Sequence, residues 1–159
     1  MINALTIDVE DYFHVSAFEN CIDPDDWPNY PIRVTESTRV ILDILDEQGV
    51  RATFFVLGWV AERAPELIKD IHRRGHEIAS HGYGHQRVNK RSRAQFRDDI
   101  RKSKALLEGL TGEQILGYRA PSYSISRTSL WAFDELLEAG FVYDSSVFPI
   151  RHDFYGIPD

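Results

Sequence analysis

The chain has 159 residues, of which 43% are hydrophobic and 12% aromatic, enough for one folded domain with a sizeable core. Its 25 acidic and 18 basic residues leave a net charge of −7, which argues against a nucleic-acid or anionic-membrane partner and fits a neutral or basic substrate. Cys21 is the only cysteine, so an internal disulfide is excluded.

The sequence shows no segment typical of export or membrane insertion. Residues 1–7 read directly into an apolar strand, and no apolar run approaches the roughly 20 residues that a membrane-spanning helix needs. We therefore expect no membrane insertion and a cytoplasmic location.

Short apolar strands alternate with amphipathic helices along the chain. Strands are expected to end near Asp8 and to occupy 50–57, 76–80, 115–118 and 141–143. Such alternation is typical of β/α units built around a parallel sheet. The sequence therefore predicts an α/β fold.

Most of the expected helices have a recognisable start signal. Thr35 is the expected N-cap of the first, Pro65 suits the first position of the second, and Ser92 with Gln95 forms a capping box for the third. A last helix is expected over 126–139. The expected buried stripe of the first helix is Val40, Ile41, Ile44 and Leu45.

A long segment over 12–32, rich in aromatics, acids and prolines, separates the first strand from the first helix. Its length indicates a lid or a substrate wall rather than a simple connection. Trp27 and Trp59 are candidates for stacking on a sugar ring, Trp59 being the better one, whereas Trp131 is expected in the core. Histidines 14, 72, 76 and 152 are expected to be solvated.

Two histidines stand four residues apart in the glycine-broken segment Ser80–His85, which follows a short strand. Neutral imidazole is a common ligand of catalytic divalent metals, and two imidazoles with one carboxylate make an open zinc-type site. Asp8, Glu10 and Asp11 follow the first strand. Because residues two apart share a face of a strand, Asp8 and Glu10 are both expected at the strand end, where β/α barrels place their functional residues.

The residues suggest a division of roles. With Glu10, His81 and His85 as ligands, a bound divalent ion would lower the pKa of a water to about 7. Asp8 would take the water proton as general base, and Arg119 would pair with Asp8 and stabilise its charge. The turn 120–123 could donate a backbone N–H to an oxyanion. Asp11 stays open as a ligand in place of Glu10, or as a residue that hydrogen-bonds the long loop.

Four segments, in order and in spacing, resemble the polysaccharide deacetylases of carbohydrate esterase family 4: Thr6–Asp8, Thr53–Gly58, Ser80–His85 and Arg119–Tyr123. The segment Asp8–His14 is similar to the branch found beside exosortase-linked exopolysaccharide clusters. The resemblance implies a distorted (β/α) TIM-like barrel that removes N-linked acetyl groups from a polysaccharide, using zinc or a related divalent metal. It also implies Asp8 as base, Glu10, His81 and His85 as metal ligands, and Arg119 as the residue that orients the base.

The chain departs from the family pattern in three ways. Val9 stands between Asp8 and Glu10 where the family has adjacent aspartates, and Ser122 shifts the expected tyrosine by one position. A full barrel runs to about 250 residues, and the family's late motif with its general-acid histidine has no counterpart here. We therefore expect an incomplete barrel of about five β/α units, with residues 1–159 as the N-terminal part of a deacetylase-like catalytic domain and an exposed sheet edge.

The function predicted from the sequence is metal-dependent hydrolysis of a non-peptide C–N amide bond, namely N-deacetylation of an N-acetylated glycan. Two alternatives remain open. One is a non-catalytic carbohydrate-binding or scaffolding module, because the general acid is missing. The other is a small-molecule ureide amidase on the same fold.

Overall fold

A computed structural model describes residues 3–152 and 155–158, so positions 1, 2, 153, 154 and 159 of the expected domain lie outside the described residues. Five parallel strands form one sheet in sequence order. They are β1 Thr6–Val9, β2 Thr53–Val56, β3 Glu77–Ser80, β4 Gly117–Tyr118 and β5 Tyr143–Asp144. Within the described residues β1 and β5 are the two edges, so the sheet does not close.

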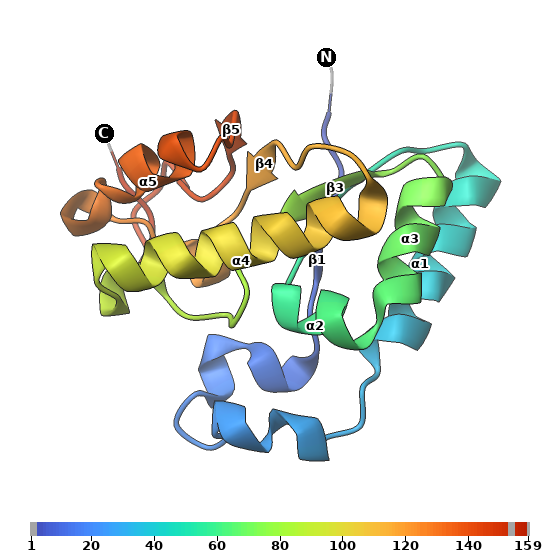
Figure 1. Ribbon diagram of the computed structural model, residues 1–159, viewed down its shortest axis with the longest axis horizontal. Coiled ribbons are helices and arrows are strands. Elements are labelled where there is room, and N and C mark those ends of the chain that lie inside the picture. Colours follow the sequence, from blue (N-terminus) through green and yellow to red (C-terminus); the bar gives the residue numbers. More distant parts are fainter. Residues whose placement is uncertain (1–2, 153–154, 159) are drawn as a thin grey trace.

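Five α-helices connect the strands (Figure 1). They are α1 Val34–Gln48, α2 Gly58–Arg63, α3 Pro65–Arg73, α4 Arg93–Thr111 and α5 Ala132–Glu138. Short 3-10 helices occupy Tyr12–His14, Ser16–Phe18, Pro24–Asn29, Val88–Lys90, Pro121–Tyr123 and Arg127–Ser129. In Figure 1 the segment 12–30 lies below the sheet, at the end where β1 finishes and α2 begins. No helix of the described chain combines the length and the apolarity needed to cross a membrane.

The pleat divides the sheet residues into two faces. Ile7, Phe54 and Ile78 lie in register on one face, as do Val9 and Val56. On the opposite face Asp8 lies in register with Phe55 and Ala79. Because side chains alternate along a strand, the first face packs under the helices and the second keeps Asp8 beside the strand ends.

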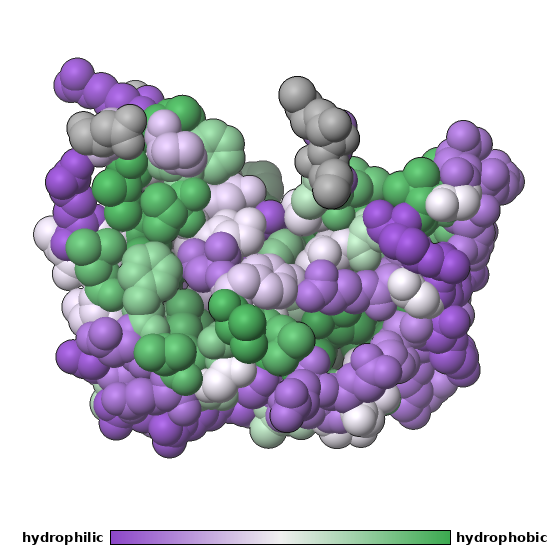
Figure 2. Space-filling view, turned by 90° about the horizontal axis from the view of Figure 1, so that it is seen from above, coloured by the Kyte–Doolittle hydropathy of each residue, from purple (hydrophilic) through white to green (hydrophobic). Residues whose placement is uncertain are grey.

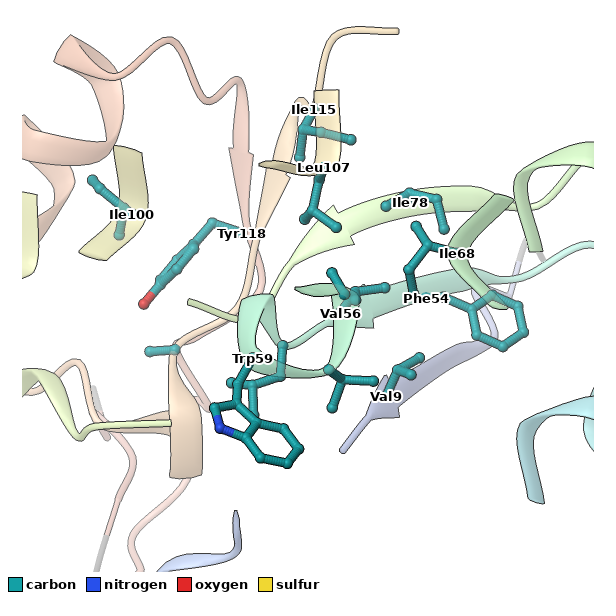
Figure 3. Close-up of a cluster of buried hydrophobic side chains, with 14 of the residues drawn as sticks. Val9, Phe54, Val56, Trp59, Ile68, Ile78, Ile100, Leu107, Ile115 and Tyr118 are labelled. Atoms are coloured by element: carbon teal, nitrogen blue, oxygen red, sulfur yellow. The ribbon is translucent and has the colours of Figure 1, made fainter. Parts of the chain in front are cut away.

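The core fills the space between the first face and the helices (Figure 3). Val9, Phe54 and Val56 are fully buried there, with Ile68 of α3 beside Phe54, while Ile100 of α4 lies on the side of Tyr118. Burial of side chains of this size contributes about 1.5–3 kcal/mol each. This packing fixes the strand ends and therefore the positions of the residues that follow them.

The start of α1 differs from the expected N-cap. Thr35 lies inside the helix, which begins at Val34, and the side chain of Asp11 accepts hydrogen bonds from the N–H groups of Arg33 and Val34 at 2.7 and 3.0 Å. A residue 22 positions away in sequence therefore takes the place of a local cap. Only the tertiary fold brings this carboxylate to the helix end.

The expected stripe of α1 is also wrong in part. Val40 and Ile44 are 55% and 53% exposed, whereas Leu42 is fully buried. The residues that α1 buries are Val34, Thr38, Leu42 and Leu45. Both sets repeat at helical spacing, so the sequence could not choose between them, and packing against α3 decided which set faces the core.

Three further elements differ from expectation. The strands are shorter than the apolar runs that predicted them, and the expected helix over 126–139 divides into Arg127–Ser129 and α5. Ser126 and Ser129 form a capping box at the start of the first piece, in which the hydroxyl of Ser129 accepts the N–H of Ser126 at 2.9 Å. Residues 58–63, which lie between the expected strand 50–57 and the expected helix start at Pro65, form α2, and the N–H groups of Gly58 and Trp59 donate to the carbonyls of Gly82 and Tyr83.

Candidate metal centre and catalytic site

Glu10, His81 and His85 come together at the carboxyl ends of β1 and β3. One potential ligand atom from each lies within 4.8 Å of the other two. His81 directly follows β3, and its N–H donates to the carbonyl of Val56 at 2.9 Å. The structure thus brings together the three residues that the sequence singles out as ligands.

The donor set fits a divalent ion. Oε2 of Glu10 is buried and lies 2.8 Å from Nε2 of His85, so two potential ligand atoms face one another. Nδ1 of His81 lies 2.9 Å from the carbonyl oxygen of Arg119, which can only accept, so Nδ1 carries the proton and Nε2 keeps its lone pair. Two such imidazoles and one carboxylate are the ligands of an open zinc-type site.

Burial and charge hold these groups in their ligand forms. Burial lowers the pKa of His81, so its imidazole is neutral at neutral pH. Burial would raise the pKa of Glu10, but the contact with His85 outweighs it and keeps that pKa below its ordinary value. A neutral imidazole and an ionised carboxylate are the states that bind a metal.

Asp8 and Arg119 form the expected ion pair beside this cluster. Oδ1 of Asp8 lies 2.7 Å from Nη1 of Arg119, and Oδ2 of Asp8 lies 4.0 Å from Nε2 of His81. Arg119 also donates to the hydroxyls of Thr6 and Ser145, at 3.0 and 2.9 Å. One carboxylate oxygen is therefore fixed by the guanidinium while the other faces the ligand cluster.

The turn after Arg119 has an unusual backbone. Ser122 and Tyr123 have φ angles of 54° and 49°, in the left-handed region. The N–H of Ala120 already donates to the hydroxyl of Ser146, and the N–H of Tyr123 donates to the carbonyl of Ala120. Because Pro121 has no N–H, the N–H of Ser122 is the remaining candidate in this turn for donating to an oxyanion.

Asp11, the alternative ligand, does not join the cluster. Its carboxylate is engaged at the start of α1, and its N–H donates to Nδ1 of His14 at 2.8 Å. The reading of Asp11 as a residue that hydrogen-bonds the loop is therefore the one that the structure supports.

Asp99 is a supporting residue that sequence reasoning missed, because a charged residue on an amphipathic helix usually belongs to its solvated face. Its side chain is only 9% exposed, and its two oxygens accept the N–H groups of Tyr83 and Gly84 at 2.8 and 3.3 Å. Arg91 balances the charge at 2.8 Å. The segment between His81 and His85 is therefore held from outside by α4.

Gly82 makes this support possible. Its φ is 74°, and a Cβ added there would lie 2.9 Å from the Oδ2 atom of Asp99. Its own N–H donates to the hydroxyl of Ser80 at 3.2 Å. Any other residue would be strained in this conformation and would push Asp99 away.

The expectation that Trp59 and Trp27 stack on a sugar ring is not supported, because they are only 6% and 5% exposed. Both pack with Phe13 and His14, and the guanidinium of Arg63 covers Trp59 at 3.9 Å. Trp131 packs partly buried against the core, as expected. The many aromatic residues of 12–30 are the sequence feature that could have indicated that this segment forms a small hydrophobic core of its own.

The expectation of solvated histidines fails at His14 and His76, which are both 3% exposed. Burial lowers the pKa of His14 to about 4, so it is neutral. Nδ1 of His76 accepts the N–H of Ala52 at 3.3 Å. His72 is partly buried, and the ring of His152 stacks on Tyr155 at 3.9 Å.

Comparison with known proteins gives a consistent result. The polysaccharide deacetylase family matches residues 23–138, which include His81, His85 and Arg119 but not Asp8 or Glu10. A peptidoglycan-N-acetylglucosamine deacetylase of Bacillus cereus is 37% identical over 101 residues, covering 63% of this chain and 37% of that protein. A peptidoglycan deacetylase of Helicobacter pylori is 33% identical over 114 residues, covering 72% of this chain and 37% of that protein.

Solved structures agree with the expected fold. A putative polysaccharide deacetylase from Mycobacterium smegmatis superposes with a TM-score of 0.76 at 32% identity, covering 91% of this chain and 50% of that one. The chain thus spans 37% of each of the two curated relatives above and half of this solved structure. The expected fold, a distorted (β/α) barrel of the polysaccharide deacetylase type, is confirmed, and the five strands of the described residues do not close it. This chain belongs to the polysaccharide deacetylase family.

Proposed function

We propose that this chain carries the metal ligands and the catalytic base of an N-deacetylase that acts on an N-acetylated polysaccharide. The observation that carries the proposal is the cluster of Glu10, His81 and His85 beside the ion pair of Asp8 and Arg119. The named activity of the relatives supports the reaction class, since both curated relatives above are peptidoglycan deacetylases.

Each residue has a role in this proposal. Glu10, His81 and His85 hold a divalent ion, for which zinc is the best match to two imidazoles and a carboxylate. When bound, such an ion supplies Lewis acidity, which lowers the pKa of a water and polarises the amide carbonyl. Asp8 accepts the proton of the attacking water at Oδ2, the oxygen that Arg119 leaves open. Arg119 orients Asp8 and stabilises its negative charge.

The first test is zinc binding, measured by titration and elemental analysis. We expect one zinc ion per chain, lost in His81→Ala, which removes one of three ligands. His72→Ala is the matched control, because His72 lies on α3 outside the cluster. Stoichiometric zinc in the His81→Ala variant would contradict the ligand assignment.

The second test separates the base from the ligands. Asp8→Asn keeps the shape of the side chain but cannot accept the proton, so zinc binding should persist while acetate release from N-acetylglucosamine oligosaccharides falls by about 10²–10⁴-fold. Unchanged release would remove Asp8 from the mechanism. Glycan binding by the zinc-loaded wild type without acetate release would favour a binding module, and hydrolysis of allantoin-like compounds instead would favour a ureide amidase.

A further inference from the structure

A pocket of about 200 Å³ lies between two segments that both reach the candidate site. One wall comes from residues 13–27 after β1, and the other from residues 84–91 after β3. His85 belongs to the second wall, so the pocket adjoins the ligand cluster. We call it the loop pocket.

Buried nitrogens without partners concentrate in the walls of the loop pocket. Eight buried side-chain atoms of the described chain have no hydrogen-bond partner, and five of these belong to residues that line this pocket. They are Nε2 of His14, Nε1 of Trp27, Nδ1 of His85, and Nε of Arg87 and Arg91. Buried polar groups normally have a partner in the protein or in bound water. Such a cluster therefore points to a polar molecule that belongs between the two walls.

Four of the five nitrogens are hydrogen-bond donors, and the fifth, Nδ1 of His85, becomes one when a metal is bound. The indole and the two guanidinium nitrogens always carry a hydrogen. His14 accepts the N–H of Asp11 at Nδ1, so its Nε2 carries the proton of the neutral ring. Nε2 of His85 faces Glu10 with a lone pair when a metal is bound, which leaves the proton on Nδ1. The occupant that satisfies this set must supply acceptor atoms.

The charges of the walls select a negative acceptor. Arg87 and Lys90 both bind the same oxygen of Glu19, Lys90 at 2.9 Å, and Arg91 is neutralised by Asp99. Among the residues that line the pocket, three are cations, Arg87, Lys90 and Arg91, and one is a carboxylate, Glu19. The whole chain has a net charge of −7. Salt screens the charges that lie far from the pocket, so the nearby charges of its walls dominate inside it.

The long loop is fastened over the site. The hydroxyl of Ser16 lies 2.6 Å from that of Ser122, in the turn that follows Arg119. Glu19 holds the same loop to the segment after His85. An occupant of the loop pocket therefore lies next to whatever group approaches Glu10 and His85.

We propose that the loop pocket binds the carboxylate of an acidic sugar unit, adjacent in the glycan to the N-acetylated unit that reaches the candidate site. This inference rests on the proposed function, because it names the substrate class of the same site. It departs from the neutral or basic substrate that the net charge favours, because the local charge is opposite to the overall one.

The test is a binding measurement that needs no turnover. The probe is the disaccharide of glucuronic acid and N-acetylglucosamine, compared with neutral N,N′-diacetylchitobiose, both titrated into the Asp8→Asn variant. We expect the acidic disaccharide to bind about tenfold more tightly, the worth of one charge-assisted hydrogen bond. It should also shift the NMR signal of the indole N–H of Trp27, identified by its loss in Trp27→Phe.

Two variants of the walls should act in opposite directions. Arg87→Gln removes a cation and a donor, so affinity for the acidic disaccharide should fall about tenfold. Glu19→Gln removes the carboxylate that competes with the ligand, so affinity should rise. Arg73→Gln is the matched control, because Arg73 is 65% exposed on α3, and it should leave affinity unchanged.

Equal affinity for the two disaccharides, or the absence of a Trp27 shift, would mean that ordered water alone fills the pocket and would overturn the inference. Loss of affinity in both Arg87→Gln and Glu19→Gln would show that the substitutions merely disturb the loop, and it would also overturn the inference. Acidic-sugar binding without acetate release by the zinc-loaded wild type would overturn the proposed function but not the loop pocket.

Discussion

At the scale of single residues, the geometry of the ligands depends on a side chain that is not a ligand. The N–H groups of His81, Gly82, Tyr83 and Gly84 are all engaged, two of them by Asp99. The segment that carries both histidines is therefore fixed without a metal. Preorganisation of this kind raises metal affinity, because less order has to be imposed on binding.

Asp99→Asn tests this support. The amide keeps one acceptor oxygen and loses the charge, so the segment should loosen and zinc affinity should fall about 10–100-fold, as measured by competition with a chromophoric chelator. Asp98→Asn is the matched control, because Asp98 is the exposed neighbour on the same helix. Equal zinc affinity in both variants would leave Asp99 without a role in positioning the ligands.

At the scale of elements, two long-range contacts decide how helices begin and how they pair. Asp11 occupies the start of α1 from the far end of β1. Glu135 of α5 is buried and binds Arg93 and Arg97 of α4 at 2.9 and 2.6 Å. Neither contact follows a local sequence rule, yet each gives a measurable contribution to stability.

Asp11→Ala leaves two N–H groups of α1 without their acceptor, so the free energy of unfolding in urea should fall by about 1–3 kcal/mol. Zinc affinity should not change, because Asp11 is not in the cluster. Glu10→Ala should instead lose zinc affinity and leave the free energy of unfolding unchanged. Loss of zinc binding in a folded Asp11→Ala variant would contradict this assignment and show that Asp11 is a ligand.

The pair of α4 and α5 gives a pH dependence. Hydrogen bonds from Arg97, opposed by burial, and from Arg93 lower the pKa of Glu135 from 4.5 to about 2. Because the folded pKa lies below the unfolded one, the pair stabilises the fold above about pH 4.5 and loses that effect as pH falls toward 2. Wild type should therefore exceed Glu135→Gln in stability at pH 6, with the gap closing at pH 2–3 in urea titrations. A gap that persists at pH 2 would contradict this linkage.

At the scale of the whole molecule, β1 and β5 are the edges of the sheet that the described residues form, and an apolar surface lies beside β5. Leu137 and Val142, next to β5, are 75% and 74% exposed. Figure 2 shows apolar side chains gathered over the half of this face that the C-terminal elements occupy. Exposed apolar surface at a sheet edge promotes association between chains.

Val142→Lys places a charge at this edge and should reduce concentration-dependent association, measured by static light scattering. Val40→Lys makes the same chemical change on the exposed side of α1, and we expect a smaller effect there because no strand edge lies beside it. A wild-type chain that stays monomeric at all concentrations would contradict this prediction.

The alternation of five strands with helices, apart from α2, and the ligand candidates Glu10, His81 and His85 could be predicted from the sequence, because strand ends and residue spacing are local properties. The sequence also predicted the pair of Asp8 and Arg119, since both follow parallel strands and meet at one edge. Only the tertiary structure decided that Asp11 serves α1, that Trp27 and Trp59 are buried, and that Asp99 holds the histidine segment. Each of these depends on contacts between residues distant in sequence, for which hydrophobic periodicity and local capping rules carry no signal.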